Sequence, residues 1–118
     1  MTLTDVDRPD GYTPGENTTL TEGVPREYTC TVTGTRPNAS VAWFVGSEEQ
    51  TTHIDTIVTD NAEDPLLSDT ISKFTLTPKR EDHHSNMTCL ASVAVSDIPP
   101  LPFPITLVVS GKYPGTFD

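Results

Sequence analysis

Short apolar runs that alternate with polar residues recur along the chain from about residue 18 onward. Val, Ile, Thr, Tyr and Phe dominate these runs, and Gly, Pro, Asn and Asp separate them. Such alternation indicates β-strands that bury one face and expose the other to water. No stretch shows sustained helical periodicity, and 11 prolines leave little room for helices. The pattern therefore predicts an all-β fold.

Five runs show the alternation most clearly, and within each run the residues of one parity are expected to face the core. These residues are Tyr28, Cys30 and Val32; Val41, Trp43 and Val45; Phe74 and Leu76; Met87, Cys89, Ala91 and Val93; and Phe103, Ile105, Leu107 and Val109. The segment 46–69 is ambiguous. Residues 53–59 fit one strand and residues 60–65 fit a loop, so the strand count there stays open.

The length of 118 residues suits one domain. Residues 1–15 are polar and rich in turn formers, which predicts a leader or a loose first edge. Residues 16–110 form the expected domain, and residues 111–118 read as a C-terminal linker to a neighbouring domain. The N-terminus lacks the basic and apolar regions of a signal peptide, and no apolar run spans a bilayer. We interpret the chain as a fragment of a longer protein.

Acidic residues outnumber basic residues by 17 to 7, and the net charge is −10. Duplex binding requires Lys and Arg against the phosphates, and adsorption to an anionic membrane requires the same sign. The composition therefore argues against a nucleic-acid partner and against membrane contact by this domain. The acidic balance is a solubility feature, or alternatively it steers a basic partner.

Two cysteines, Cys30 and Cys89, fall on the predicted buried parity of their strands, and Trp43 falls on the buried parity between them. This Cys…Trp…Cys arrangement is typical of immunoglobulin domains, in which a disulfide joins the two sheets and the indole packs against it. Two buried thiols of a cytosolic protein are the alternative.

Three N-glycosylation sequons favour a secreted protein with a disulfide over a cytosolic protein with two thiols. The acceptors are Asn17, Asn38 and Asn86, and none has Pro at the middle position. Three sequons beside a matched cysteine pair indicate an extracellular glycoprotein. Glycans on Asn38 and Asn86 would shield one end and one face of the domain.

Two stretches resemble a known family. They are EGVPREYTCTVTGTRPNASVAW at residues 22–43 and FTLTPKREDHHSNMTCLA at residues 74–91. The first resembles strands B and C of C2- or I-type immunoglobulin domains in nectin- and nephrin-like adhesion receptors, and the second resembles their E–F corner and strand F. The resemblance implies an immunoglobulin-like two-sheet Greek-key sandwich with one inter-sheet disulfide, Cys30–Cys89. The chain departs from the pattern at Met87, where many relatives have Tyr, and at His84, where such corners often have Gly.

The sequence offers no constellation for catalysis. It has no nucleophile elbow, no phosphate-binding loop and no free cysteine once the disulfide forms. We expect no enzyme activity and no cofactor. Asp82, His83 and His84 could begin a metal site, but neighbouring side chains on a loop rarely converge on one ion, so we expect no metal. Asp82 is expected to bond local backbone amides instead.

Two surfaces are candidates for partner binding. Phe44, Leu90 and Val108 are expected to point outward on the sheet with strands C, F and G, and the resemblance implies that partners dock on this face. Ile98 and Leu101 are expected at the tip of a proline-stiffened loop, residues 97–104, between strands F and G. The alternatives are scattered surface apolar residues, a covering neighbour domain, or prolines that guard an edge strand.

The sequence thus favours a cell-adhesion or recognition module of a multidomain surface receptor. It would bind a protein partner, either homophilic or heterophilic, through the C/F/G face or the F–G loop. One alternative is a structural spacer without a ligand of its own. Another is a secreted immune-type protein that binds microbial carbohydrate.

Overall fold

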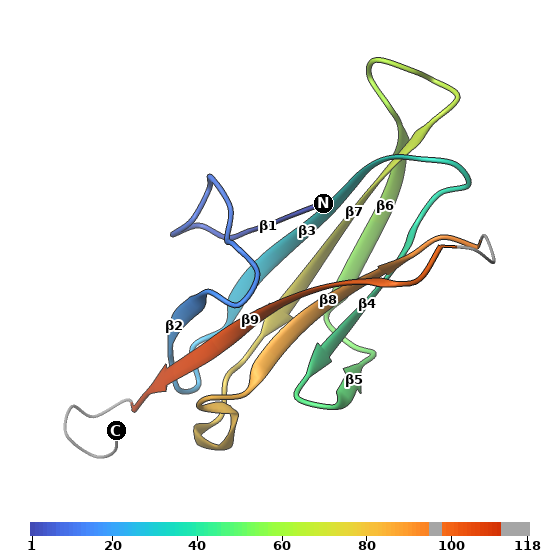
Figure 1. The fold of residues 1–118 in the computed structure, drawn as a ribbon. Coiled ribbons are helices and arrows are strands. Elements are labelled where there is room, and N and C mark those ends of the chain that lie inside the picture. Colours follow the sequence, from blue (N-terminus) through green and yellow to red (C-terminus); the bar gives the residue numbers. More distant parts are fainter. Residues whose placement is uncertain (95–97, 112–118) are drawn as a thin grey trace.

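The computed structural model describes residues 1–94 and 98–111, which form two β-sheets packed against each other (Figure 1). The first sheet contains, in spatial order, β1 (Thr2–Thr4), β3 (Arg26–Thr35), β7 (Ser68–Leu76) and β6 (Ile54–Asp60). The second sheet contains β2 (Asn17–Thr21), β9 (Leu101–Ser110), β8 (Asn86–Ser92), β4 (Ser40–Val45) and β5 (Glu48–Gln50). The predicted all-β two-sheet sandwich is confirmed. No helix in this part of the chain is long and apolar enough to cross a membrane.

The core lies between the sheets and follows the predicted parity. Its buried members include Tyr28, Cys30, Val32, Phe74, Leu76, Met87, Cys89, Ala91, Phe103, Ile105, Leu107 and Val109. Val41 and Val45 on β4 are only partly buried, although both pack against the core. Only the short β5 flanks β4 on one side, so these valines are less covered than residues on central strands.

A disulfide between Cys30 on β3 and Cys89 on β8 joins the two sheets, as predicted. Trp43 on β4 is fully buried, and its ring centroid lies 5.3 Å from that of Phe74. The indole Nε1–H donates a hydrogen bond to Ser72 Oγ at 2.9 Å. The buried indole therefore has a partner on the opposite sheet for its one polar group.

The ambiguous segment 46–69 contributes one strand to each sheet. β5 pairs with β4, and β6 pairs with β7. The predicted strand over 53–59 is observed one residue later, as Ile54–Asp60. This segment therefore carries the chain across from the second sheet to the first.

The first fifteen residues, which we expected to be a leader or a loose first edge, contribute an edge strand and part of the core. β1 pairs antiparallel with β3, and both Leu3 and Tyr12 are buried. β2 then pairs in parallel with β9 in the other sheet. In the expected linker, residues 112–118 lie outside the described residues.

Pro102 and Pro104 lie within β9, which begins at Leu101. We expected residues 97–104 to form a loop with Leu101 at its tip. This expectation is wrong for residues 101–104, which belong to the strand. Asp97 lies outside the described residues. The backbone N–H of Thr106 donates to Glu16 O, on the β2 side of β9. Backbone direction alternates along a strand, so the nitrogens of both prolines face this same side.

The pairing of β2 with β9 begins only at Asn17, opposite Thr106. The two prolines therefore lie where β9 pairs with β8 on one side but has no strand on the side that their nitrogens face, so their missing N–H groups cost no ladder hydrogen bond. This placement agrees with the alternative interpretation, in which the prolines guard an edge strand.

Candidate functional site

On the outer surface of the second sheet, strands β4, β8 and β9 form an uncharged patch, which we call the neutral face. Its residues alternate with the buried residues of β4, β8 and β9, so they point away from the core. The neutral face consists of Ser40, Ala42, Phe44, Asn86, Thr88, Leu90, Ser92, Pro102, Pro104, Thr106 and Val108. None of these side chains is charged, although the chain as a whole carries −10.

Phe44 and Leu90 lie near the middle of the neutral face. Leu90 is opposite Ala42, whereas Phe44 is opposite Thr88, two residues before Leu90. Phe44 and Leu90 are therefore diagonal neighbours, with Cα atoms about 7–8 Å apart and side chains within reach of each other. Both are partly buried. Together they form a small apolar centre whose neighbours on β4, β8 and β9 are all neutral.

The structure does not bring all the predicted partner-binding residues together. Val108 lies on β9 beyond Thr106, opposite Thr19 of β2, and six residues from the row that contains Leu90. At about 3.4 Å per residue, this separation is about 20 Å. Val108 therefore belongs to the opposite end of the face.

Ile98 and Leu101 are 53% and 57% exposed, but neither belongs to the neutral face. Leu101 is paired with the buried Ala91 and shares the inward parity of Phe103. It is exposed because it lies at the end of the sandwich, beyond the main core. The two apolar candidates of the F–G region are therefore a separate surface at that end.

Charge distinguishes the two outer faces. The outer face of the first sheet carries Glu27, Asp55, Asp69 and Lys73. Glu49 on β5 is directly opposite Phe44, at the edge of the second sheet. The neutral face is thus bordered by a carboxylate but has none within it.

All three sequon asparagines are exposed. Asn38 lies in the turn between β3 and β4, at the Ser40 end of the neutral face. Asn17 and Asn86 lie at the other end, and each is opposite Thr106 on a different side of β9. The proximity of Asn17 to Asn86 was not predicted, because it depends on the parallel pairing of β2 with β9.

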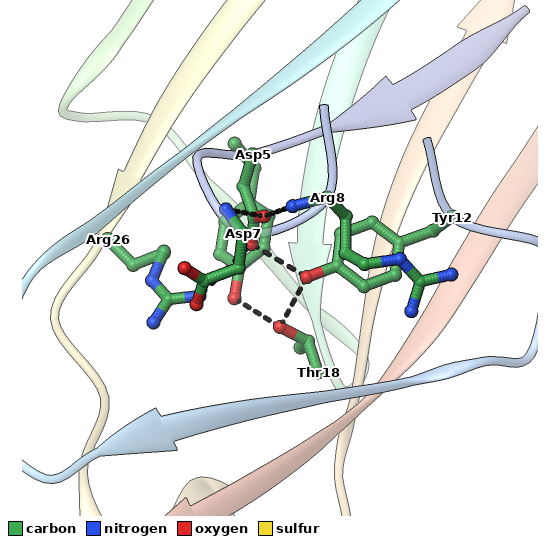
Figure 2. Close-up of polar contacts among 7 residues, drawn as sticks. Asp5, Asp7, Arg8, Tyr12, Thr18 and Arg26 are labelled. Atoms are coloured by element: carbon green, nitrogen blue, oxygen red, sulfur yellow. Dashed lines mark hydrogen bonds and ion pairs between the residues drawn. The ribbon is translucent and has the colours of Figure 1, made fainter. Parts of the chain in front are cut away.

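A buried polar network fixes the N-terminal segment to both sheets (Figure 2). Tyr12 OH donates to Asp5 Oδ2 at 2.7 Å, so its oxygen accepts from Thr18 Oγ1 at 2.9 Å. Because the Thr18 hydrogen is used there, Tyr28 OH donates to Thr18 Oγ1, also at 2.9 Å. Three hydroxyl groups thus form a directed chain that ends on one carboxylate.

Arg26 balances the charge of this network. Its Nη1 lies 3.2 Å from Asp5 Oδ2 and 2.9 Å from Asp7 Oδ2. The Asp5 carboxylate has no exposed side-chain surface, so a cation at this distance offsets the cost of its burial. Burial raises the pKa of Tyr12 to about 12, and burial also raises the pKa of Tyr28.

The sequence reasoning missed this network, because residues 1–15 show no periodicity. The only signal available was the alternation of Thr18 and Leu20 with exposed residues in β2, which marks Thr18 as an inward polar side chain. An inward threonine requires hydrogen-bond partners, and Tyr12 and Tyr28 supply them.

A shallow hollow of about 350 Å³ lies between β5 and the 3-10 helix η1 (Arg80–Asp82). Its polar lining includes Glu48, His53, Lys79 and Asp82. The Asp82 carboxylate accepts a hydrogen bond from the backbone N–H of Lys79, as predicted for a local turn. In the described part of the chain, no three His, Cys, Asp or Glu side chains are grouped as metal ligands would be.

Comparison with known proteins adds a family and a fold. Residues 13–96 match the family model of CD80-like C2-set immunoglobulin domains. The crystal structure of Rst D1-D2 superimposes with a TM-score of 0.74 over 92% of this chain, at 24% sequence identity. This chain covers 48% of that chain, which is about half of its length. A search of curated proteins found no match. Because 1150 solved chains match in structure, the fold alone does not select a partner.

Proposed function

The chain belongs to the family of CD80-like C2-set immunoglobulin domains, and we propose that it is an adhesion domain that binds a second copy of itself through the neutral face. The family is non-enzymatic. Membership, together with the Cys30–Cys89 disulfide, supports an extracellular recognition-type module. The proposal adds the surface and the partner to this general role.

The absence of charge on the described residues of the neutral face carries the proposal. When two identical faces meet across a two-fold axis, a charge near that axis approaches its own copy, and such a like-charge contact costs several kcal/mol. A protein of net charge −10 would repel itself on most surfaces. The neutral face avoids this repulsion, and Phe44 and Leu90 provide apolar area at its centre.

A carbohydrate partner has less support from the surface. Sugar-binding sites commonly use exposed aromatic rings, which present a flat apolar surface. Among the Phe, Tyr and Trp residues that the structure describes, only Phe44 is not buried. One partly buried ring on an otherwise aliphatic and hydroxyl-rich face suits a protein contact better. A spacer without a ligand remains the outcome if no association is found.

Analytical ultracentrifugation of the oxidised domain, from low micromolar to near-millimolar concentration, tests the proposal. We expect reversible dimerisation of the wild-type domain. The double variant Phe44→Asp, Leu90→Asp places like charges at the centre of the contact and should stay monomeric.

The matched control is Thr31→Asp, Ile57→Asp, which adds the same two charges to the outer face of the first sheet. This control should dimerise as the wild type does. A wild-type monomer at every concentration would overturn self-adhesion. A dimer that survives Phe44→Asp, Leu90→Asp would place the contact on another surface.

A further inference from the structure

Asn17 and Asn86 lie in one cross-strand row with Thr106 between them. Asn17 pairs with Thr106 in the parallel ladder, and Asn86 pairs with Thr106 in the antiparallel ladder. Neighbouring strands are about 4.8 Å apart, so the two asparagine backbones are about 10 Å apart. All three residues point away from the core, because their neighbours Thr18, Met87 and Ile105 are buried. Two sequons distant in sequence therefore project from the same end of one face.

Both acceptor asparagines are held in place. Thr18, the middle residue of the first sequon, is anchored by hydrogen bonds to Tyr12 and Tyr28, which orients Asn17 outward. The Oδ1 of Asn86 accepts a hydrogen bond from Thr106 Oγ1 at 3.2 Å. This bond leaves Nδ2, the atom that carries an N-linked glycan, available. Glycans on these residues would start from a rigid sheet.

We propose that N-glycans on Asn17 and Asn86 form a paired shield over the Val108 end of the neutral face and confine docking to the region around Phe44 and Leu90. An N-glycan is bulky and hydrated, and two of them 10 Å apart enclose the surface between them. Thr106 lies in that gap, and Val108 is the next outward residue of β9. Only the docking part of this inference depends on the proposed function.

The third sequon, Asn38, bounds the remaining surface at its Ser40 end. Leu90 is four residues from Asn86 along β8, which places it about 13 Å from the shield. Asn38 lies just before Ser40, which is opposite Ser92 at the other end of the face. A glycan at Asn38 would therefore border the docking region at the end opposite to Asn17 and Asn86. The surface that stays open has Leu90 near its middle.

Hydroxyl-radical footprinting tests the shield without any assumption about a partner. The full chain is secreted from a glycosylating eukaryotic host, and site occupancy is measured by mass spectrometry. Side-chain oxidation is then compared before and after enzymatic removal of glycans from the folded protein. Glycans of this size should slow oxidation of Val108 by roughly threefold or more, with a much smaller effect at Leu90. Ile57, which is 51% exposed on the first sheet, is the internal control and should not change.

Single variants separate the two glycans. Asn17→Gln and Asn86→Gln should each restore part of the Val108 oxidation rate, and the double variant should restore all of it. Equal oxidation of Val108 with and without glycans overturns the proposal, as does an unoccupied Asn17 or Asn86 in the secreted protein. If Val108 is protected but the glycosylated protein stays monomeric, the shield stands and self-adhesion fails. A dimer whose contact is footprinted at Val108 overturns the confinement of docking.

Discussion

The imidazole Nδ1 of His83 accepts a hydrogen bond from the backbone N–H of Val109, with 3.0 Å between the two nitrogens. This bond extends the pairing of β8 with β9 beyond Asn86, the first residue of β8. There the Leu107 N–H donates to Ser85 O, as in a regular strand pair. The imidazole then takes the place of the next strand carbonyl. His83 therefore fastens the last residues of β9 to the corner between β7 and β8.

Replacement of His83 by Ala should weaken this end of β9. Val109 is 1% exposed, so its N–H would lose its partner with little access to water, at a cost of about 1–3 kcal/mol. His83→Asn should retain most of the stability, because its Oδ1 can accept the same bond. Denaturant midpoints and amide exchange at Val109 measure both effects. Unchanged exchange at Val109 in His83→Ala would contradict this role.

Replacement of Ser72 by Ala should destabilise the core more than its small volume suggests. The Trp43 Nε1–H would be left buried without an acceptor, which costs about 1–3 kcal/mol. Ser72 Oγ also contacts Thr56 Oγ1 at 2.8 Å, so Thr56→Val serves as the control that keeps the indole bond. Chemical denaturation followed by Trp43 fluorescence compares the two. Equal losses of stability in Ser72→Ala and Thr56→Val would show that the hydrogen bond to the indole contributes no more than the contact between Ser72 and Thr56.

The core could be read from the sequence because each strand buries one face, and alternation reports that face directly. In β9, for example, Phe103, Ile105, Leu107 and Val109 are all buried as predicted. The disulfide followed from the same parity, because Cys30 and Cys89 both lie on the inward side of their strands. These features depend only on local periodicity and on the spacing typical of the family.

Features that depend on pairing between distant segments could not be predicted. The position of Pro102 and Pro104 within β9 depends on which side of the strand lacks a neighbour, and the sequence does not report this. The juxtaposition of Asn17 and Asn86 depends on the parallel pairing of β2 with β9. The burial of Asp5 depends on two partners outside its own turn, Tyr12 and Arg26 on β3.

Removal of the disulfide should cost a large part of the domain's stability. Cys30 and Cys89 are 59 residues apart, and closing a loop of this length contributes about 4 kcal/mol by chain entropy. That is comparable to the whole stability of many domains, which lies at about 5–15 kcal/mol. Cys30→Ala, Cys89→Ala should therefore unfold at a much lower denaturant concentration than the oxidised wild type. A midpoint within error of the wild type would contradict the estimate.

The buried tyrosine network predicts a loss of stability at alkaline pH. Burial raises the pKa of Tyr12 from 10.0 to about 12 in the folded protein. Above pH 10 the unfolded chain loses the phenolic proton while the folded chain keeps it, so stability falls as pH rises from about 10 to about 12. Burial raises the pKa of Tyr28 too, so Tyr28 acts in the same direction.

Tyr12→Phe isolates the contribution of one hydroxyl. The variant loses hydrogen bonds to Asp5 and Thr18, so it should be less stable than the wild type at neutral pH. It also lacks the titrating group, so its denaturant midpoint should fall less steeply between pH 10 and pH 12. The lysines titrate in both proteins, so their contribution cancels when the slope of the variant is subtracted from that of the wild type. Parallel slopes would mean that Tyr12 ionises as readily in the folded domain as in the unfolded chain.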